Sequence, residues 1–200
     1  MSTAPALDPA HTALLVMDYQ PAIILAALPE GGEREALLGR VEGAIADVRA
    51  GGGTIAYVRV GFTEADWDAI PAANKSFAPL AQYRVMHHED PAAFVHERLA
   101  PQDGDIVVRK IRHGGMSTTD LDQQLRGRGI TTLVVSGITT SGAVLSTVID
   151  AADRDYRLYV LSDGVADPDT EAHDVLLRQV LPSRAHIIDT SELPALLRAG

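Results

Sequence analysis

Residues 132–154, TLVVSGITTSGAVLSTVIDAADR, contain the pattern that decides the fold. Thr132–Ser136 is a short apolar, β-branched run, whereas Gly142–Arg154 has the residue spacing of an amphipathic helix. The turn between them is rich in Gly, Ser and Thr, as is typical of a strand that leads directly into a helix. This stretch therefore predicts a strand and the crossover helix of a βαβ unit.

The same alternation of apolar runs and helical patterns recurs along the chain. Further strands are expected at Ala13–Met17, Thr54–Val60, Ile106–Val108, Leu158–Leu161 and Ala185–Ile188. Further helices are expected at Arg34–Ala50, Pro91–Leu99, Thr118–Arg126, Thr170–Val180 and Glu192–Ala199. Continuous apolar strands that alternate with helices predict an α/β fold, in which helices cover both faces of a parallel sheet. No repeat or linker is evident, so we expect a single domain over residues 1–200.

Composition excludes several classes of function. The formal net charge of −10 argues against a nucleic-acid partner, because phosphate binding needs a basic surface. The chain has no cysteine, which excludes disulfides, thiolate metal sites and a thiol nucleophile. The segment Gly129–Ile149 is uncharged, but it contains eight Ser and Thr residues and has a strand-turn-helix pattern. No Lys or Arg precedes Arg34, so a secretory signal is not expected. We expect a cytoplasmic protein with no membrane partner.

Common cofactor and metal motifs are missing. Gly51–Gly53 precedes a strand instead of following one, so it does not match a dinucleotide-binding turn. Walker and Gly-x-Ser-x-Gly sequences do not occur, and Ala100 stands where a zinc-protease motif beginning at His96 needs its second histidine. The run His87–Asp90 is interpreted as a solvated loop, since neighbouring residues rarely converge on one ion. We therefore expect neither a metal nor a cofactor.

Polar features follow three of the predicted strands. Asp18 comes directly after Ala13–Met17, Lys110 ends the segment DIVVRK, and the turn Gly137–Val144 follows the strand quoted first. Each alone has a plain structural interpretation, as a turn acid, a solvated strand end or a helix cap. The carboxyl ends of parallel strands form the ligand-binding edge of such sheets. Their joint placement therefore predicts one functional site.

Four segments together resemble the isochorismatase-like (cysteine hydrolase) family. They are TALLVMDYQ at 12–20, DIVVRK at 105–110, TDLDQQL at 119–125 and GITTSGAVLSTV at 137–148. Their order and spacing match the family over nearly the whole chain. The resemblance implies a three-layer α/β/α sandwich with a six-stranded parallel sheet in the order 3-2-1-4-5-6. The stretch Asn74–Phe77 resembles a subgroup that lacks the metal-binding histidines of the nicotinamidase branch.

The resemblance also implies a catalytic set. The family uses an Asp, Lys and Cys triad, and Asp18 and Lys110 match its first two positions. Ala143 occupies the cysteine position. The backbone N–H groups of Thr139 and Ala143 would hold an oxyanion, and the peptide between Ile138 and Thr139 would be cis. Relatives commonly form dimers or tetramers, so a homo-oligomer is expected.

Alanine at position 143 leaves three functions open. The first is a cofactor-independent hydrolase of a small organic molecule, in which Asp18 transfers a proton to a vinyl ether and water captures the cation. The second is an amide hydrolase that Ala143 has inactivated, and the third is a catalytically silent binding protein. Lys110 should lower the pKa of Asp18, which suits a base, unless burial outweighs the lysine.

The lining of the pocket is predicted by position only. Candidate substrate contacts are Tyr19, Gln20, Ile24, Phe62, Phe77, His113 and Met116. A core role fits most of them equally well. The weakly patterned region 61–86 is interpreted either as a functional loop or as ordinary surface packing.

Overall fold

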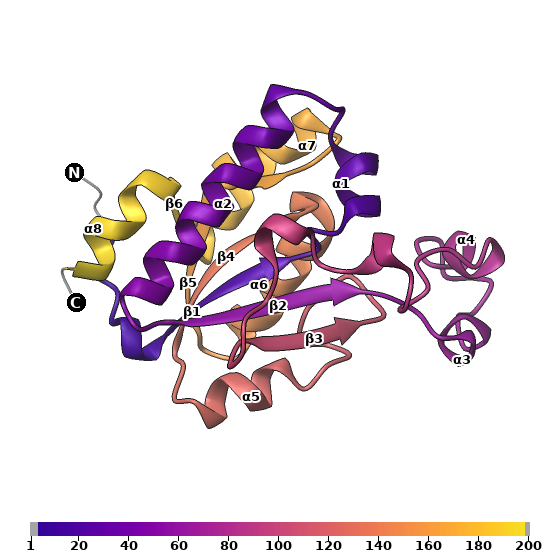
Figure 1. The fold of residues 1–200 in the computed structure, drawn as a ribbon, viewed down its shortest axis with the longest axis horizontal. Helices are drawn as coiled ribbons and strands as arrows, with labels where there is room; N and C mark the ends of the chain where they lie inside the picture. Colours follow the sequence, from indigo (N-terminus) through magenta and orange to yellow (C-terminus); the bar gives the residue numbers. More distant parts are fainter. Residues whose placement is uncertain (1–3, 199–200) are drawn as a thin grey trace.

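A computed structural model describes residues 4–198 and has a parallel six-stranded sheet at its centre (Figure 1). The strand order is β3-β2-β1-β4-β5-β6, which confirms the predicted order. Every neighbouring pair is parallel. The strands are β1 Thr12–Met17, β2 Thr54–Val60, β3 Ile106–Lys110, β4 Thr132–Ile138, β5 Arg157–Ala166 and β6 His186–Ile188.

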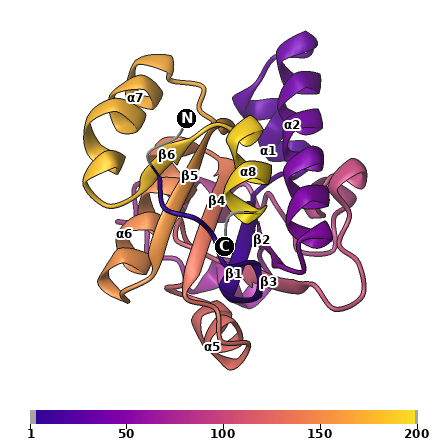
Figure 2. The ribbon, with the colours of Figure 1, turned by 90° about the vertical axis from the view of Figure 1, so that its left-hand side faces the viewer.

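Helices cover both faces of the sheet and confirm the three-layer α/β/α sandwich. In Figure 2, α2 and α8 lie on one side of the strands, whereas α6 and α7 lie on the other. The helices are α1 Pro21–Ala27, α2 Gly32–Ala50, α3 Glu64–Asp68, α4 Ala78–Gln82, α5 Leu121–Gly127, α6 Leu145–Asp153, α7 Thr170–Val175 and α8 Leu193–Arg198. A π-helical turn, Thr140–Val144, connects β4 to α6.

The side chains of β1 show how the two layers of core are built. Successive residues of a strand point to opposite faces. Accordingly Leu14 and Val16 belong to the core beneath α2 and α8. Leu15 and Met17 belong to the second core, beneath α5 and α6. Because both faces of β1 are buried, its sequence is continuously apolar instead of alternating.

The helix predicted over Pro91–Leu99 is wrong. Two separate 3-10 turns, Pro91–Ala93 and Glu97–Leu99, occupy this stretch. The carboxylate of Asp90 accepts from the first turn, and the ring of His96 accepts from the second. Each turn has its own cap, so the backbone between them stays extended.

The region 61–86 contains two short helices that the hydrophobic pattern did not reveal. Thr63 and Asp66 form a reciprocal capping box at the start of α3. Helices α3 and α4 project beyond the ends of β2 and β3 (Figure 1). A small third core lies beneath them, comprising Val60, Phe62, Trp67, Ile70 and Phe77. Packing in this core therefore explains the aromatic residues Phe62, Trp67 and Phe77.

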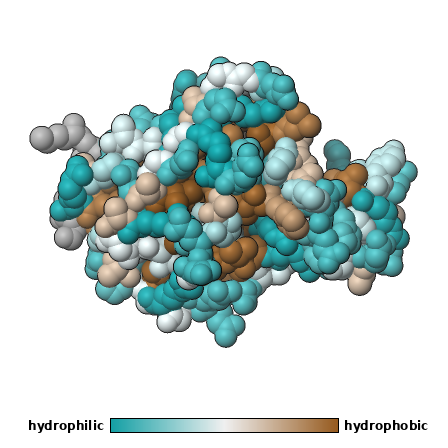
Figure 3. Space-filling view, in the orientation of Figure 1, coloured by the Kyte–Doolittle hydropathy of each residue, from teal (hydrophilic) through white to brown (hydrophobic). Residues whose placement is uncertain are grey.

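The surface seen in Figure 3 is mostly hydrophilic, with separate hydrophobic patches. Across residues 4–198, no helix has the length and apolar character needed to cross a membrane. The uncharged segment Gly129–Ile149 is divided between β4, the π-helical turn and the start of α6.

Candidate active site

The predicted site residues lie where the strand order reverses. Asp18 follows β1, Lys110 ends β3, and the turn after β4 carries Thr139 and Ala143. Strand β1 lies between β2 and β4, which makes this the switch point at which doubly wound sheets bind ligands. A cavity of about 190 Å³ opens here. Its lining residues are Asp18, Ile23, Val60, Ser76, Phe77, Leu80, Lys110, Arg112, His113, Ile138, Thr139 and Ala143.

A tight turn directs Asp18 toward the cavity. Its φ is +58°, a left-handed conformation that Asp adopts more readily than most residues. The Asp18 N–H donates to the carbonyl of Val58 at 2.8 Å, and its carbonyl accepts from the N–H of Gln20 at 2.8 Å. These bonds fix the backbone on both sides of the carboxylate.

Lys110 binds Asp18 in a buried ion pair. The distance from Nζ to Asp18 Oδ2 is 2.7 Å, and the side chains are 3% and 6% exposed. Nζ also donates to the carbonyls of His113 at 2.9 Å and Arg112 at 3.2 Å. These three acceptors use all three N–H groups of the ammonium. Lys110 therefore supplies charge and anchors the following loop.

The second carboxylate oxygen of Asp18 has a different environment. Oδ1 is buried and has no hydrogen-bond partner among residues 4–198. Burial raises the pKa of Asp18 above its ordinary value of 3.8, and the charge and hydrogen bond of Lys110, together with the nearby N–H of Val60, oppose this rise only in part. An acid role for Asp18 requires that burial raise its pKa more than Lys110 lowers it, and the direction of the shift agrees with this requirement. The free oxygen is therefore suited to hold a proton and deliver it to a ligand.

The turn after β4 is fixed by its own hydroxyl groups. The Oγ1 atom of Thr139 accepts from the N–H of Gly142 at 3.2 Å. Ser141 donates its N–H and its hydroxyl to Asp167 at 2.8 and 2.6 Å. Thr140 Oγ1 lies 2.8 Å from Nδ1 of His173. Thr140 and Ser141 do not line the cavity, and the hydroxyl of Thr139 caps the turn, so none of the three is placed to attack a ligand there.

The turn also places a helix start at the cavity. The π-helical turn and α6 run without interruption from Thr140 to Asp153. The first N–H groups of a helix lack intrahelical acceptors and favour negative charge. The peptide between Ile138 and Thr139 is cis, as the resemblance implied. Ala143, which is 3% exposed, brings only a methyl group to the cavity.

An Isochorismatase domain matches residues 12–192 of the chain. The chain belongs to the isochorismatase family. The ureidoacrylate amidohydrolase RutB of Methylobacterium radiotolerans is 35% identical over 178 residues, which cover 79% of this chain and 68% of that protein. The N-carbamoylsarcosine amidase of Thermoplasma acidophilum has a structure with a TM-score of 0.73 and 25% identity, covering 90% of this chain and 97% of that one.

A cysteine hydrolase from Pseudomonas syringae pv. phaseolicola has the same fold, with a TM-score of 0.84 and 24% identity. The match covers 100% of this chain and 99% of that one. As a member of the isochorismatase family, the present chain is a hydrolase of small molecules.

The predicted substrate contacts divide into two groups in this isochorismatase-family fold. Phe77 and His113 line the cavity, and their rings lie 4.7 Å apart between centroids. The others are buried and do not line it: Tyr19, Gln20, Ile24, Phe62 and Met116. Ile24, Phe62 and Met116 belong to the hydrophobic cores, whereas Tyr19 and Gln20 form hydrogen bonds next to Asp18.

Gln20 and Tyr19 have a supporting role. The Gln20 amide donates to the carbonyls of Val60 and Ala93 at 2.7 and 2.6 Å, and accepts from the N–H of Val60 at 2.8 Å. The Tyr19 hydroxyl donates to the carbonyl of Gly164 at 2.5 Å. Both side chains connect the Asp18 turn to neighbouring strands and loops.

Sequence reasoning did not single out Arg112, Ser76 or Ile23, which also line the cavity. Arg112 lies two residues after Lys110, and this proximity in the sequence could have indicated that it lines the cavity. Ser76 and Ile23 come from segments with weak periodicity, so only the folded chain places them at the site.

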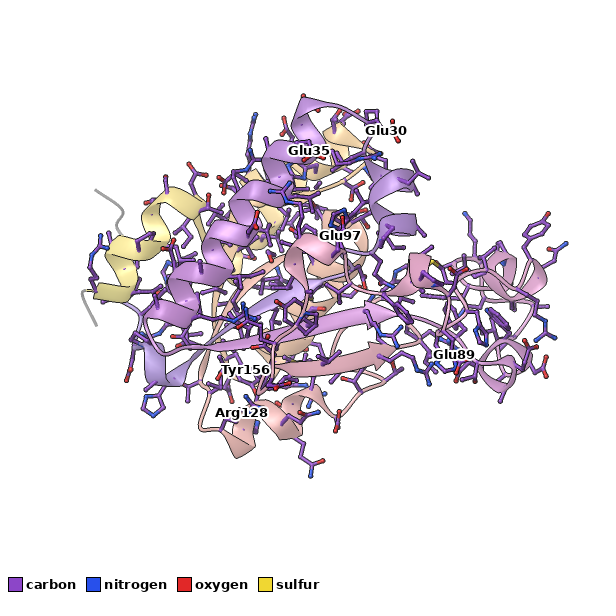
Figure 4. The ribbon with its side chains drawn as sticks, viewed as in Figure 1. Glu30, Glu35, Glu89, Glu97, Arg128 and Tyr156 are labelled. Atoms are coloured by element: carbon purple, nitrogen blue, oxygen red, sulfur yellow. The ribbon has the colours of Figure 1, made fainter. Side chains whose placement is uncertain are left out.

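The run predicted to be a solvated loop brings three potential metal ligands together. Donor atoms of His87, His88 and Glu89 lie within 4.8 Å of one another. None of them lines the cavity, and Figure 4 shows Glu89 on the projecting part of the molecule. His87 Nδ1 already accepts from the N–H of Glu89 at 3.4 Å. The absence of a bound metal stays a prediction.

Proposed function

We propose that this chain hydrolyses a small enol ether, with Asp18 as the general acid and water as the nucleophile. The observation that carries the proposal is the buried, unpartnered Oδ1 atom of Asp18 beside the cavity. A carboxyl group in this setting keeps its proton more readily than an ordinary one. Ala143 offers no side-chain nucleophile, so a covalent acyl-enzyme is not part of the proposal.

The chemistry balances without a cofactor. Asp18 gives its proton to the terminal carbon of the enol ether, which leaves a cation at the carbon bearing the ether oxygen. Water adds to that carbon and returns a proton to the Asp18 carboxylate. The resulting hemiketal collapses to a ketone and an alcohol. A positioned general acid of this kind typically contributes about 10²–10⁴-fold to the rate.

The other site residues have supporting roles in this proposal. Lys110 stabilises the Asp18 carboxylate that forms after proton transfer, because its ammonium is 2.7 Å away. The N–H groups of Thr139 and Ala143, at the start of a helix, bind a substrate oxygen that carries negative charge. The roles of Phe77 and His113 are to contact the substrate at the wall of the cavity.

Amide hydrolysis is the second candidate, and it is favoured by the relatives, which are named as an amidohydrolase and an amidase. In this chain a water molecule would have to attack the amide directly.

One experiment separates these functions. We expect the wild type to release pyruvate from 2-ethoxyacrylate, and Asp18→Asn to abolish that release. Ala143→Cys should not increase this activity, since the proposed reaction does not use a side-chain nucleophile. Cleavage of N-carbamoyl amides by the wild type, with 2-ethoxyacrylate untouched, would refute the enol-ether proposal. If the wild type converts neither substrate, the enol-ether proposal is refuted as well.

We also propose that the enzyme works without a cofactor, in the cytoplasm and as a homo-oligomer. The resemblance to oligomeric relatives supports the last point. Light scattering of the purified chain at several concentrations tests it, and a mass equal to one chain throughout would contradict it.

A further inference from the structure

Arg112 lies at the junction of two cavities. It lines the 190 Å³ cavity that contains Asp18, and it also lines an adjoining cavity of about 330 Å³. Phe77 and His113 are shared by the two in the same way. A ligand that extends from Asp18 into the outer cavity would therefore pass the Arg112 side chain.

The guanidinium of Arg112 has no acidic partner. Within residues 4–198, no carboxylate lies within 4.0 Å of it, although the protein has a net charge of −10. Its Cζ lies 5.3 Å from the centroid of the Phe77 ring, and one nitrogen donates to the carbonyl of Ile111 at 2.5 Å. The ring and the carbonyl hold the side chain in place while most of its donors stay available.

No nearby negative charge among the described residues neutralises the positive charge of this guanidinium. Asp150 lines the outer cavity, but it accepts from Arg154 at 2.6 Å. Burial, together with the charge of Lys110, lowers the pKa of His113, so its ring is largely neutral at pH 7. A protonated Asp18 would leave the charge of Lys110 unbalanced as well. The junction therefore has a positive potential within an acidic protein.

We propose that Arg112 selects the substrate by binding a carboxylate at the junction of the two cavities. The planar guanidinium and a carboxylate match in geometry and form charge-assisted, two-pronged hydrogen bonds. This inference rests on the proposed function, because it assumes that the reacting group of the substrate faces Asp18. The remainder of the substrate enters the outer cavity, whose amide and hydroxyl groups come from Asn74, Ser76, Ser117 and Ser146.

Equilibrium binding of a substrate analogue that cannot react tests the proposal. The probe is 2-ethoxypropanoate, the saturated counterpart of 2-ethoxyacrylate, and its neutral methyl ester is the reference ligand. Calorimetry on the wild type should give an affinity for the anion roughly 10- to 100-fold above that for the ester. Arg112→Gln should remove this preference, whereas Arg112→Lys should keep part of it.

Arg128→Gln is the matched control. Arg128 is exposed, donates to the carbonyl of Gly104 at 2.8 Å and has no carboxylate within 4.0 Å among the described residues. Figure 4 shows it beside α5, far from the projecting part that carries Glu89. This control removes the same charge from the protein, so it should bind the anion like the wild type.

Two results would overturn the proposal. One is equal affinity of the wild type for anion and ester, or no binding of the anion at millimolar concentration. The other is a folded Arg112→Gln variant that keeps the preference. If Arg112→Gln does not fold, Arg112→Lys takes its place: a reduced preference for the anion is expected, and an unchanged preference would overturn the proposal. Anion binding without hydrolysis of 2-ethoxyacrylate would refute the proposed function alone, and hydrolysis without anion preference would refute this inference alone.

Discussion

Two neighbouring residues of β3 form ion pairs that differ in almost every physical respect. Arg109 binds Asp66 at 2.7 Å, and Lys110 binds Asp18 at the same distance. The Asp66 side chain is 19% exposed, whereas that of Asp18 is 6% exposed. The Oδ2 atom of Asp66 also accepts from the N–H and the hydroxyl of Thr63, but the Oδ1 atom of Asp18 has no hydrogen-bond partner in the described part of the chain.

The difference in burial, together with the difference in hydrogen bonding, sends the two pKa values in opposite directions. Burial raises the pKa of Asp66, but the hydrogen bonds from Thr63 and the charge of Arg109 outweigh it, so the net shift is downward. Burial prevails at Asp18, and its pKa is raised. A partly exposed carboxylate with several hydrogen-bond donors stabilises a fold, whereas a deeply buried one with fewer donors retains a proton that it can transfer.

The largest expected effect is on turnover. Asp18→Asn should lower kcat for 2-ethoxyacrylate by about 10³-fold, because the amide cannot donate a proton as an acid does. Asp66→Asn should change kcat by less than about 3-fold, since its pair only supports the fold. Pyruvate release measures both. Similar losses in the two folded variants would remove the contrast between the pairs.

The next effect concerns stability. Lys110→Met should lower the free energy of unfolding by about 3 kcal/mol, since it breaks a buried pair and the bonds to two carbonyls. Protonation of Asp18 keeps the cost from rising further. Arg109→Met should cost about 1 kcal/mol, because its pair is partly exposed. Urea denaturation of both variants measures the difference, and equal losses would contradict it.

The pH dependence of the reaction sharpens the comparison. Since only the protonated Asp18 carboxyl donates a proton, kcat/KM for 2-ethoxyacrylate should fall as the pH rises through its raised pKa. Asp66→Asn should show the same profile as the wild type. A rate that instead increases with pH over this range would identify Asp18 as a base.

The smallest effect is the pH dependence of the Asp66 pair. A lowered pKa stabilises the fold above the ordinary value of 3.8, and this contribution is lost as the pH falls through the lower folded value. Asp66→Asn should therefore cost about 1 kcal/mol at pH 7 and almost nothing in strong acid. A cost that persists unchanged in acid would show that charge is not its origin.

The sequence was sufficient to predict those residues of the site that lie at the ends of strands. Asp18 and Lys110 follow apolar runs, so the topology brings them to one edge of the sheet. The sheet order followed from the resemblance. By contrast, Leu80 and Ser76 reach the cavity through a region whose short helices depend on capping and on two contacts between aromatic rings.

The electrostatics of the site could not be predicted from the sequence. The chain order reveals that Lys110 accompanies Asp18, but not that one carboxylate oxygen is buried without a partner. The availability of Arg112 depends equally on its folded neighbours, since Lys110 binds the carbonyls of the loop that carries it. Burial and hydrogen-bond counts are properties of the folded chain, and here they decide the chemistry.

The most direct test of the account is a titration of the two aspartates by carbon-13 NMR of their carboxyl groups, with Asp18→Asn and Asp66→Asn used for assignment. Asp18 is predicted to titrate above 3.8 and Asp66 below it. If Asp18 titrates at or below 3.8, it is an ordinary ionised partner of Lys110, and the general-acid account fails.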